Sequence, residues 1–260
     1  MLYLIGIDDT DNATTGATGH LARDLRKQIG DRNLARTISI SRHQLFLSPE
    51  IPYTSHNSSA CMMVDTQPES VNLLIDYCRE YLCKYSQPGS DVGLCVAQWE
   101  RVSSAVQAFG KQAKETVLTQ AQGISIASQA GIFLEGLTGT QDGIIGALAG
   151  VGLRKTGNDG RIIWIPGLYE LYGTYTVSQL YQMLSIDRIQ DLAGDLLSSD
   201  ARIQIQLSKE TKMKTGRWPR PVLIDGQAVM LVVKAFSEKD AIGKNNNEYE
   251  LAPKDIIRQY

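Results

Sequence analysis

An apolar run near the start of the chain, Leu2 to Ile7, leads directly into three acidic residues, Asp8, Asp9 and Asp11. Four to eight apolar residues bounded by turn-forming residues are typical of a buried strand, so the acids are expected where that strand ends. Crowded carboxylates repel one another unless a cation or a strong donor offsets them. Because Mg²⁺ prefers oxygen ligands and often bridges to phosphate, we predict that these three acids bind Mg²⁺.

A plainer interpretation of the same stretch is a polar turn with helix-capping Asp and Thr residues. Against it, the acids are followed by a loop rich in Thr and Gly, with glycines at positions 16 and 19. Glycine loops and helix N-termini bind anions. We therefore favour a functional site over a simple turn.

The composition is that of an ordinary globular protein: 260 residues, 43% hydrophobic, 21% charged, with a net charge of -2. No overall positive charge favours nucleic acid or an anionic membrane. The four cysteines form no C-x-x-C pair, and no apolar run approaches the ~20 residues that span a bilayer. We expect a soluble cytoplasmic protein with no membrane partner.

Periodic patterns predict alternating strands and helices, hence an α/β (α+β) fold. The order is a helix from near Thr18, a strand at 35–41, a long polar loop at 49–59, a strand at 60–64 and an amphipathic helix at 68–85. Long loops that a domain retains are usually functional.

A glycine-rich block, residues 136 to 157, is the next landmark, with Gly139, Gly143 and Gly146 at its start. A glycine turn that feeds a helix lets backbone N–H groups approach a phosphate. The spacing fits neither the Walker pattern nor the dinucleotide fingerprint. Close packing of a helix on a strand explains the glycines equally well.

The glycine-rich pattern stops near Gly173, where we place a boundary between residues 1–173 and residues 174–260. The second part is expected to contain a helix at 177–184, a strand at 202–207 and a hairpin. The hairpin is predicted by Asp225-Gly226 between two apolar runs.

Histidines are few, and none of His20, His43 and His56 has a metal-binding spacing to another His or Cys. Each alone is more typical of a polar loop residue. His43 and His56 gain interest from nearby Arg42 and Asn57, because such groups bind phosphate or orient a nucleophile.

Two further patterns have competing interpretations. A strand followed by D-x-D-x-T is typical of phosphatases with an aspartyl nucleophile, but the chain has Ala13 where the pattern has Thr. The segment from Lys209 to Arg220 interleaves basic residues with Trp218, which could bind a single-stranded nucleic acid or a nucleotide. A solvated loop is the commoner outcome for such a segment.

Three separated stretches resemble the archaeal tRNA-isoleucine agmatinylcytidine synthetase family. The opening GIDDTDN is similar to its GIDDTDS segment, and DGIIGALAGVG is similar to its G-I-I-G-A-L-A-A-I-G block. SPEIPYTSHNSSA corresponds more loosely to a middle N-P-x-x-P-x-K-T-R-G-N-G-A block. The resemblance covers most of residues 1 to 175.

This resemblance implies a kinase-like catalytic domain followed by a smaller ferredoxin-like domain, with ATP and Mg²⁺ as cofactors. By the same resemblance Asp8, Asp9 and Asp11 would hold Mg²⁺ and the triphosphate, and Thr18 would match a family threonine that can carry phosphate. His56 stands where the family's block has Arg. The family's OB-fold and zinc ribbon, which hold tRNA, have no counterpart in this sequence.

We therefore predict a nucleotide-binding transferase or ligase-like enzyme, related to tRNA modification, that transfers a phosphoryl or nucleotidyl group from Mg·ATP to an unidentified acceptor. The departures disfavour RNA as a partner. The alternatives are a metal-dependent phosphatase or nucleotide hydrolase, and a non-catalytic nucleotide-binding protein that works with an RNA-binding partner. The predicted catalytic residues are Asp8, Asp9, Asp11, Thr18 and His56; the predicted cofactor-binding residues are Arg42, His43, Asn57, Gly139, Gly143 and Gly146.

Overall fold

The structure is a computed structural model that describes residues 1–11, 18–51, 57–206, 219–235 and 247–260. The chain divides into two compact units, Met1–Ile163 and Trp164–Tyr260. This division comes earlier than the predicted boundary near Gly173. The assignment of residues 1–173 to catalysis and 174–260 to a ferredoxin-like domain stays a prediction.

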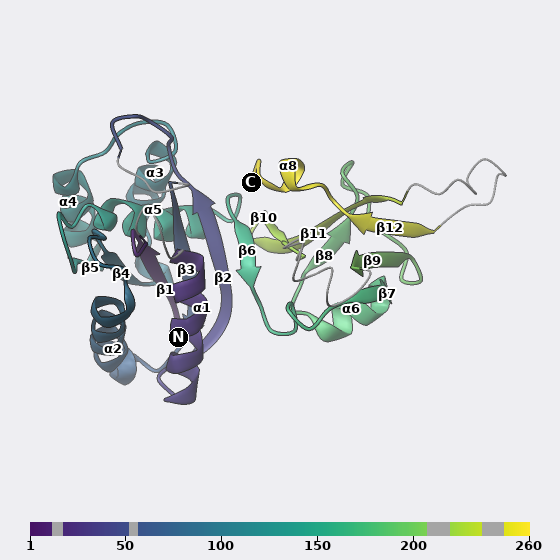
Figure 1. Ribbon diagram of the computed structural model, residues 1–260, viewed down its shortest axis with the longest axis horizontal. Coiled ribbons are helices and arrows are strands. Elements are labelled where there is room, and N and C mark those ends of the chain that lie inside the picture. The colour runs from purple at the N-terminus through teal and green to yellow at the C-terminus, as the bar shows by residue number, and fades with distance from the viewer. Residues whose placement is uncertain (12–17, 52–56, 207–218, 236–246) are drawn as a thin grey trace. The chain divides into compact units, whose positions relative to one another are not determined.

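Unit 1 is built on a sheet with the strand order β5-β4-β1-β3-β2, in which every neighbouring pair is antiparallel (Figure 1). Strand β6 follows β2 in that order. The strands are β1 (Leu2–Asp8), β2 (Arg36–Gln44), β3 (Ser58–Asp65), β4 (Gly93–Gln98), β5 (Phe133–Gly136) and β6 (Arg161–Trp164). The helices are α1 (Thr18–Asp31), α2 (Val71–Tyr85), α3 (Ser104–Gln112), α4 (Gln120–Ala130) and α5 (Gly143–Thr156), with short 3₁₀ turns at Pro68–Ser70 and Trp99–Arg101.

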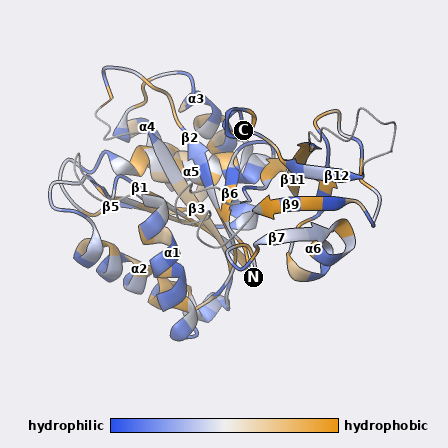
Figure 2. Cartoon of the chain, turned by 45° about the vertical axis from the view of Figure 1, so that its right-hand side comes forward, coloured by the Kyte–Doolittle hydropathy of each residue, from blue (hydrophilic) through white to orange (hydrophobic). Residues whose placement is uncertain are grey.

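Successive side chains of β1 point to opposite faces of this sheet. Leu4 belongs to the core that β1 forms with α3, α4 and α5, whose buried members include Phe109 and Leu148. Ile5 and Ile7, which are also fully buried, point to the opposite face, where α1 and α2 lie. Both of these helices carry hydrophilic and hydrophobic residues in Figure 2, as expected for helices with one buried side.

Glycines bring the backbone of α5 directly against the strands. A Cβ on Gly6 of β1 would overlap the carbonyl of Ala147, and a Cβ on Gly93 of β4 would overlap the backbone of Gly143 and Ile144. The glycine-rich block therefore does form a helix packed closely on strands.

Unit 2 pairs its strands in the order β10-β11-β12-β9-β7, and β8 adds to β11 in parallel. The Asp225-Gly226 turn joins β10 to β11 as predicted, with positive φ at both residues. The elements are β7 (Gly173–Thr176), α6 (Val177–Met183), β8 (Arg188–Gln190), β9 (Arg202–Gln206), β10 (Val222–Ile224), β11 (Gln227–Lys234), β12 (Glu248–Leu251) and α8 (Lys254–Ile257).

The fold class is thus a mixture of helices and mostly antiparallel strands, as the α+β prediction allowed. Within the residues that the structure describes, no helix is both long and apolar enough to cross a membrane. Lys209 to Trp218, the greater part of the predicted basic segment, lies outside the described residues.

The close contact between α5 and β4 can be tested with two glycine substitutions. Gly93→Ala is expected to lower the free energy of unfolding by about 2–3 kcal/mol, because the new methyl group must push the start of α5 away from the sheet. Gly30→Ala is the control: it lies in α1 with no atom within 4 Å of the added Cβ, so the higher helix propensity of Ala should stabilise by about 0.5–1 kcal/mol. Urea unfolding measures both, and a Gly93→Ala variant as stable as the wild type would contradict the contact.

Candidate functional site

The acidic residues meet where β1 ends. Asp8 is the last residue of β1 and pairs with Gly93 of β4. The next residue, Asp9, has φ 53, a left-handed conformation that non-glycine residues seldom adopt. Strained backbone of this kind concentrates at functional sites, and here it turns the chain directly after Asp8.

The pKa of Asp8 shows how unfavourable this crowding is. Burial, reinforced by the charges of Asp9 and Asp11, raises the pKa of Asp8 to about 8, although a backbone hydrogen bond at Asp9 and the charge of Arg42 act in the opposite direction. Without a cation, the Asp8 carboxyl is therefore largely protonated at neutral pH.

Asp9 is perturbed in the same direction. Burial and the charge of Asp91, followed by that of Asp11, raise its pKa to about 6, and Asp142 adds to the effect. The sequence prediction missed Asp91 and Asp142. No local pattern in the sequence marks them, because their effect on Asp9 depends on the pairing of β1 with β4 and on the position of the start of α5.

Gly146 on α5 makes room for the Asp8 carboxylate. A Cβ at this position would overlap the Asp8 carboxylate, and a Cβ on Gly143 would crowd the carbonyl of Asp91. Gly139 has φ +55, and its Cβ would overlap the Asp91 carboxylate. All three glycines predicted to bind a cofactor thus lie against Asp8 or Asp91.

The amides of this loop are mostly engaged within the protein. Gly143 N–H donates to the Asp91 carbonyl at 2.8 Å, Ile144 N–H to Gln141 at 3.2 Å and Ile145 N–H to Asp142 at 3.0 Å. The Thr140 amide donates to the Asp91 carboxylate. The structure thus accounts for the glycines by close packing, and a phosphate cradle formed by these amides stays a prediction.

Arg42 is the basic side chain whose charge acts on Asp8. It lies on β2, and its Nε donates to Ser58 Oγ on β3 at 2.8 Å. A guanidinium group is a good ligand for phosphate because it donates several hydrogen bonds from a planar group. The charge of Arg42 thus acts on Asp8, and its predicted cofactor-binding role stays a prediction.

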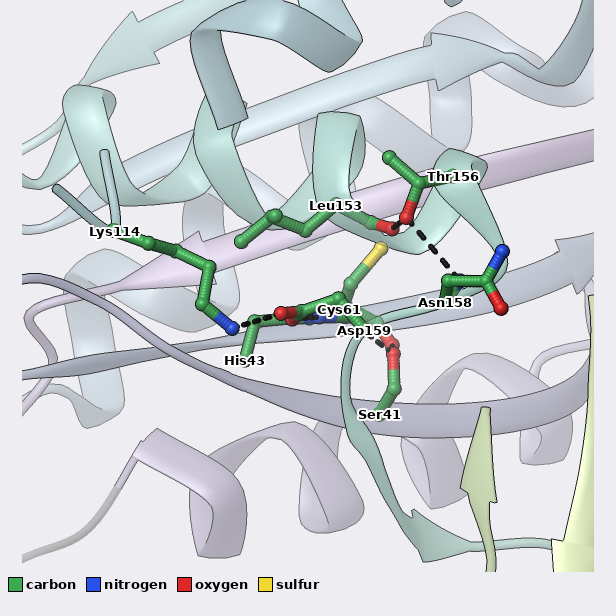
Figure 3. Close-up of polar contacts among 8 residues, drawn as sticks. All are labelled: Ser41, His43, Cys61, Lys114, Leu153, Thr156, Asn158 and Asp159. Atoms are coloured by element: carbon green, nitrogen blue, oxygen red, sulfur yellow. Dashed lines mark hydrogen bonds and ion pairs between the residues drawn. The ribbon is translucent and has the colours of Figure 1, made fainter. Parts of the chain in front are cut away.

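His43 faces away from solvent (Figure 3). Its ring is fully buried, with Nε2 2.8 Å from Ser41 Oγ and Nδ1 2.9 Å from Asp159 Oδ1. Asp159 also forms an ion pair with Lys114. Burial lowers the pKa of His43 despite the opposing effect of Asp159, so the imidazole is neutral at neutral pH.

Asp159 is ionised in this network. Burial alone would raise its pKa, but hydrogen bonds and charges from His43 and Lys114 outweigh burial and lower it. Both nitrogens of His43 are thereby occupied, which disfavours the predicted contact between His43 and a nucleotide in this conformation.

The buried chain of Ser41, His43 and Asp159 has the connectivity of a hydrolytic triad, with a hydroxyl on one imidazole nitrogen and a carboxylate on the other. Ser41 is fully buried, however, and no substrate reaches it in this conformation. The network joins β2 to the segment after α5, and Lys114 adds a third attachment. Its role in this conformation is therefore structural.

The other three predicted residues are Thr18, Asn57 and His56, and the structure describes the first two. Thr18 is buried at the start of α1, where its Oγ1 accepts a hydrogen bond from Thr10 at 3.2 Å. Asn57 donates from Nδ2 to the Phe46 carbonyl at 2.7 Å and so closes the base of the 45–57 loop. His56 lies outside the described residues. The roles predicted for Thr18, Asn57 and His56 stay predictions.

The donor chemistry at the acidic cluster fits a hard cation. Carboxylate oxygens are the ligands that Mg²⁺ prefers, and a cation would relieve the repulsion that raises the pKa values of Asp8 and Asp9. Across the described ranges, however, no three Asp, Glu, His or Cys side chains converge as a ready-made metal site. The predicted Mg²⁺ ligands Asp8, Asp9 and Asp11 would have to converge on binding.

Comparison with solved structures finds several similar chains. Apo TiaS, a tRNA agmatidine synthetase, matches 58% of this chain with 24% identity and a TM-score of 0.51. A tRNA fluorescent labeling enzyme matches with 26% identity, and TiaS in complex with an isoleucine tRNA and ATP with 25%, both at a TM-score of 0.51 and over 58% of the chain. The resemblance seen in the sequence is thus confirmed in the structure.

The match covers only part of those proteins. This chain spans about a third of their length, 35% of apo TiaS and 36% of the other two. No protein-family model matches the sequence, and no curated protein does.

The raised pKa of Asp8 predicts a specific dependence of stability on pH. A carboxyl whose folded pKa lies above its unfolded value stabilises fully at low pH, and that stability is lost as pH rises from about 4 to about 8. Asp8→Asn should therefore unfold less readily than the wild type at pH 8, by at least about 1 kcal/mol after allowance for water near the carboxyl, and the difference should vanish near pH 4.

Chemical denaturation at several pH values without divalent cations measures this difference. Asp65→Asn is the control with the opposite sign, because the N-terminal amine and Arg36 lower the pKa of Asp65. Removing that carboxylate should destabilise at neutral pH and have less effect in acid. A stability gain for Asp8→Asn that is independent of pH would contradict the assigned crowding.

Proposed function

We propose that unit 1 binds ATP with Mg²⁺ and transfers a phosphoryl or nucleotidyl group to an acceptor that is not identified. The observation that supports this most strongly is the group of Asp8, Asp9 and Asp11 at the end of β1, in which the pKa values of Asp8 and Asp9 are raised and the charge of Arg42 acts on Asp8. The likeness to TiaS, which has been crystallised with an isoleucine tRNA and ATP, favours ATP as the ligand.

In this proposal Asp8, Asp9 and Asp11 hold the cation. When bound, Mg²⁺ neutralises charge on the phosphate oxygens, on which phosphoryl transfer largely depends. Arg42 contacts the transferred group, and its hydrogen bond to Ser58 fixes its direction. Gly146 keeps α5 close enough to exclude water from one side of Asp8.

A tRNA is one candidate for the acceptor. TiaS binds an isoleucine tRNA, but this chain spans only about a third of TiaS. The kinase-like and ferredoxin-like assignments of the two units belong to the same proposal.

Calorimetry of ATP binding in the presence of Mg²⁺ tests the proposal. The double variant Asp8→Asn, Asp9→Asn should lose at least tenfold in affinity, about 1.4 kcal/mol, because the cation would lose two charged ligands. Asp31→Asn with Asp65→Asn is the matched control. It removes the same charge at the far ends of α1 and β3 and should bind like the wild type.

Analysis of products by ³¹P spectroscopy then separates the alternatives. ADP with a phosphorylated acceptor indicates phosphoryl transfer, and AMP with pyrophosphate indicates nucleotidyl transfer. Release of phosphate without any acceptor would identify a hydrolase instead, and binding without turnover would identify a nucleotide sensor. Equal ATP affinity in the wild type and the Asp8, Asp9 double variant would refute the proposed site.

A further inference from the structure

One buried hydroxyl beside the acidic cluster has no partner. Ser59 on β3 is fully buried, and its Oγ forms no hydrogen bond with any described residue. Buried polar groups are nearly always hydrogen-bonded, and an unsatisfied one destabilises the fold. An alanine at this position would avoid that penalty, so the serine needs another explanation.

The register of the sheet places Ser59 across from Asp8. Ile7 of β1 pairs with Ala60 of β3, so the next position of the same antiparallel ladder sets Asp8 opposite Ser59. Residues opposite each other in such a ladder have Cβ atoms about 4.5–5.5 Å apart on the same face. The two side chains are therefore neighbours under α5.

The glycines of α5 accommodate both groups. A Cβ on Gly146 would overlap the Asp8 carboxylate, and a Cβ on Gly150 would crowd Ser59 Oγ. These two glycines are four residues apart and so lie one above the other on one helix face. The helix thus leaves space for a carboxylate and a hydroxyl side by side. The hydroxyl forms no hydrogen bond there.

The neighbour on the other side of Ser59 cannot satisfy this hydroxyl. His43 pairs with Ser59 in the β2–β3 ladder, but its two nitrogens already bond Ser41 and Asp159 (Figure 3). The adjacent Ser58 accepts from Arg42. Of the two residues opposite Ser59 on the neighbouring strands, Asp8 is the one that can still accept a hydrogen bond from its hydroxyl.

We propose that Ser59 is a positioning residue for Asp8, whose hydroxyl donates to the Asp8 carboxylate when that carboxylate engages its ligand. The inference rests on the proposed function, because the ligand is the cation of Mg·ATP. The hydrogen bond fixes one carboxylate oxygen against β3 and leaves the other to face the cation. Without the ligand, the Ser59 hydroxyl forms no hydrogen bond.

Ser59→Ala provides a test in which stability and binding change in opposite directions. Its melting temperature without nucleotide should equal or exceed that of the wild type, because an unsatisfied hydroxyl is removed. Its affinity for Mg·ATP should fall about tenfold, about 1.4 kcal/mol. If Ser59 had only a structural role, its replacement would not lower the affinity for Mg·ATP while the melting temperature stayed the same or rose.

Thr37→Val is the matched control. Thr37 also has a buried Oγ1 without a partner, but it lies near the start of β2, at the end remote from His43. This variant should likewise keep or raise the melting temperature, and its affinity for Mg·ATP should match that of the wild type.

The inference and the proposed function fail in different ways. If the wild type binds Mg·ATP and Ser59→Ala binds it equally well or melts at a clearly lower temperature, the inference is overturned and the proposed function stands. If the wild type does not bind Mg·ATP, the proposed function falls. Titration with Mn²⁺ alone, followed by electron paramagnetic resonance, then decides the inference: weaker binding by Ser59→Ala supports it, and equal or absent binding overturns it.

Discussion

The close approach of α5 to the sheet is the contact on which the rest of unit 1 depends. Because Gly6, Gly93 and Gly143 lack side chains, helix and strand backbones touch directly at β1 and β4. The same contact forms the acidic cluster, since Gly146 is the position where the helix admits the Asp8 carboxylate. The packing of α5 on the strands and the position of the Asp8 carboxylate thus both depend on glycines at this contact.

The sequence was most informative where a short-range pattern has a single structural solution. Thr18 does begin α1, and Asp225-Gly226 does form a hairpin turn. The apolar run before Asp8 is a buried strand, since a run of that length flanked by turn formers has little else to form. These predictions needed only local periodicity and turn chemistry.

Contacts between distant segments were beyond such reasoning. Asp159 lies far along the chain from His43, and no local pattern links them, so His43 was taken for a ligand-binding residue rather than part of a buried network. Asp91 was missed for the same reason: its effect on Asp9 depends on the pairing of β1 with β4. The glycine block had two equally good explanations, and only the backbone contacts showed that packing applies.

The raised pKa values of Asp8 and Asp9 also imply that the affinity of this site for a cation depends on pH. A cation bound there as proposed would displace the protons that Asp8, and below about pH 6 also Asp9, hold in its absence. Its binding would then release protons into solution, and its apparent affinity would increase as pH rises from about 6 to about 8. A small acidification of the medium would weaken such a site without any change in the concentration of the ion.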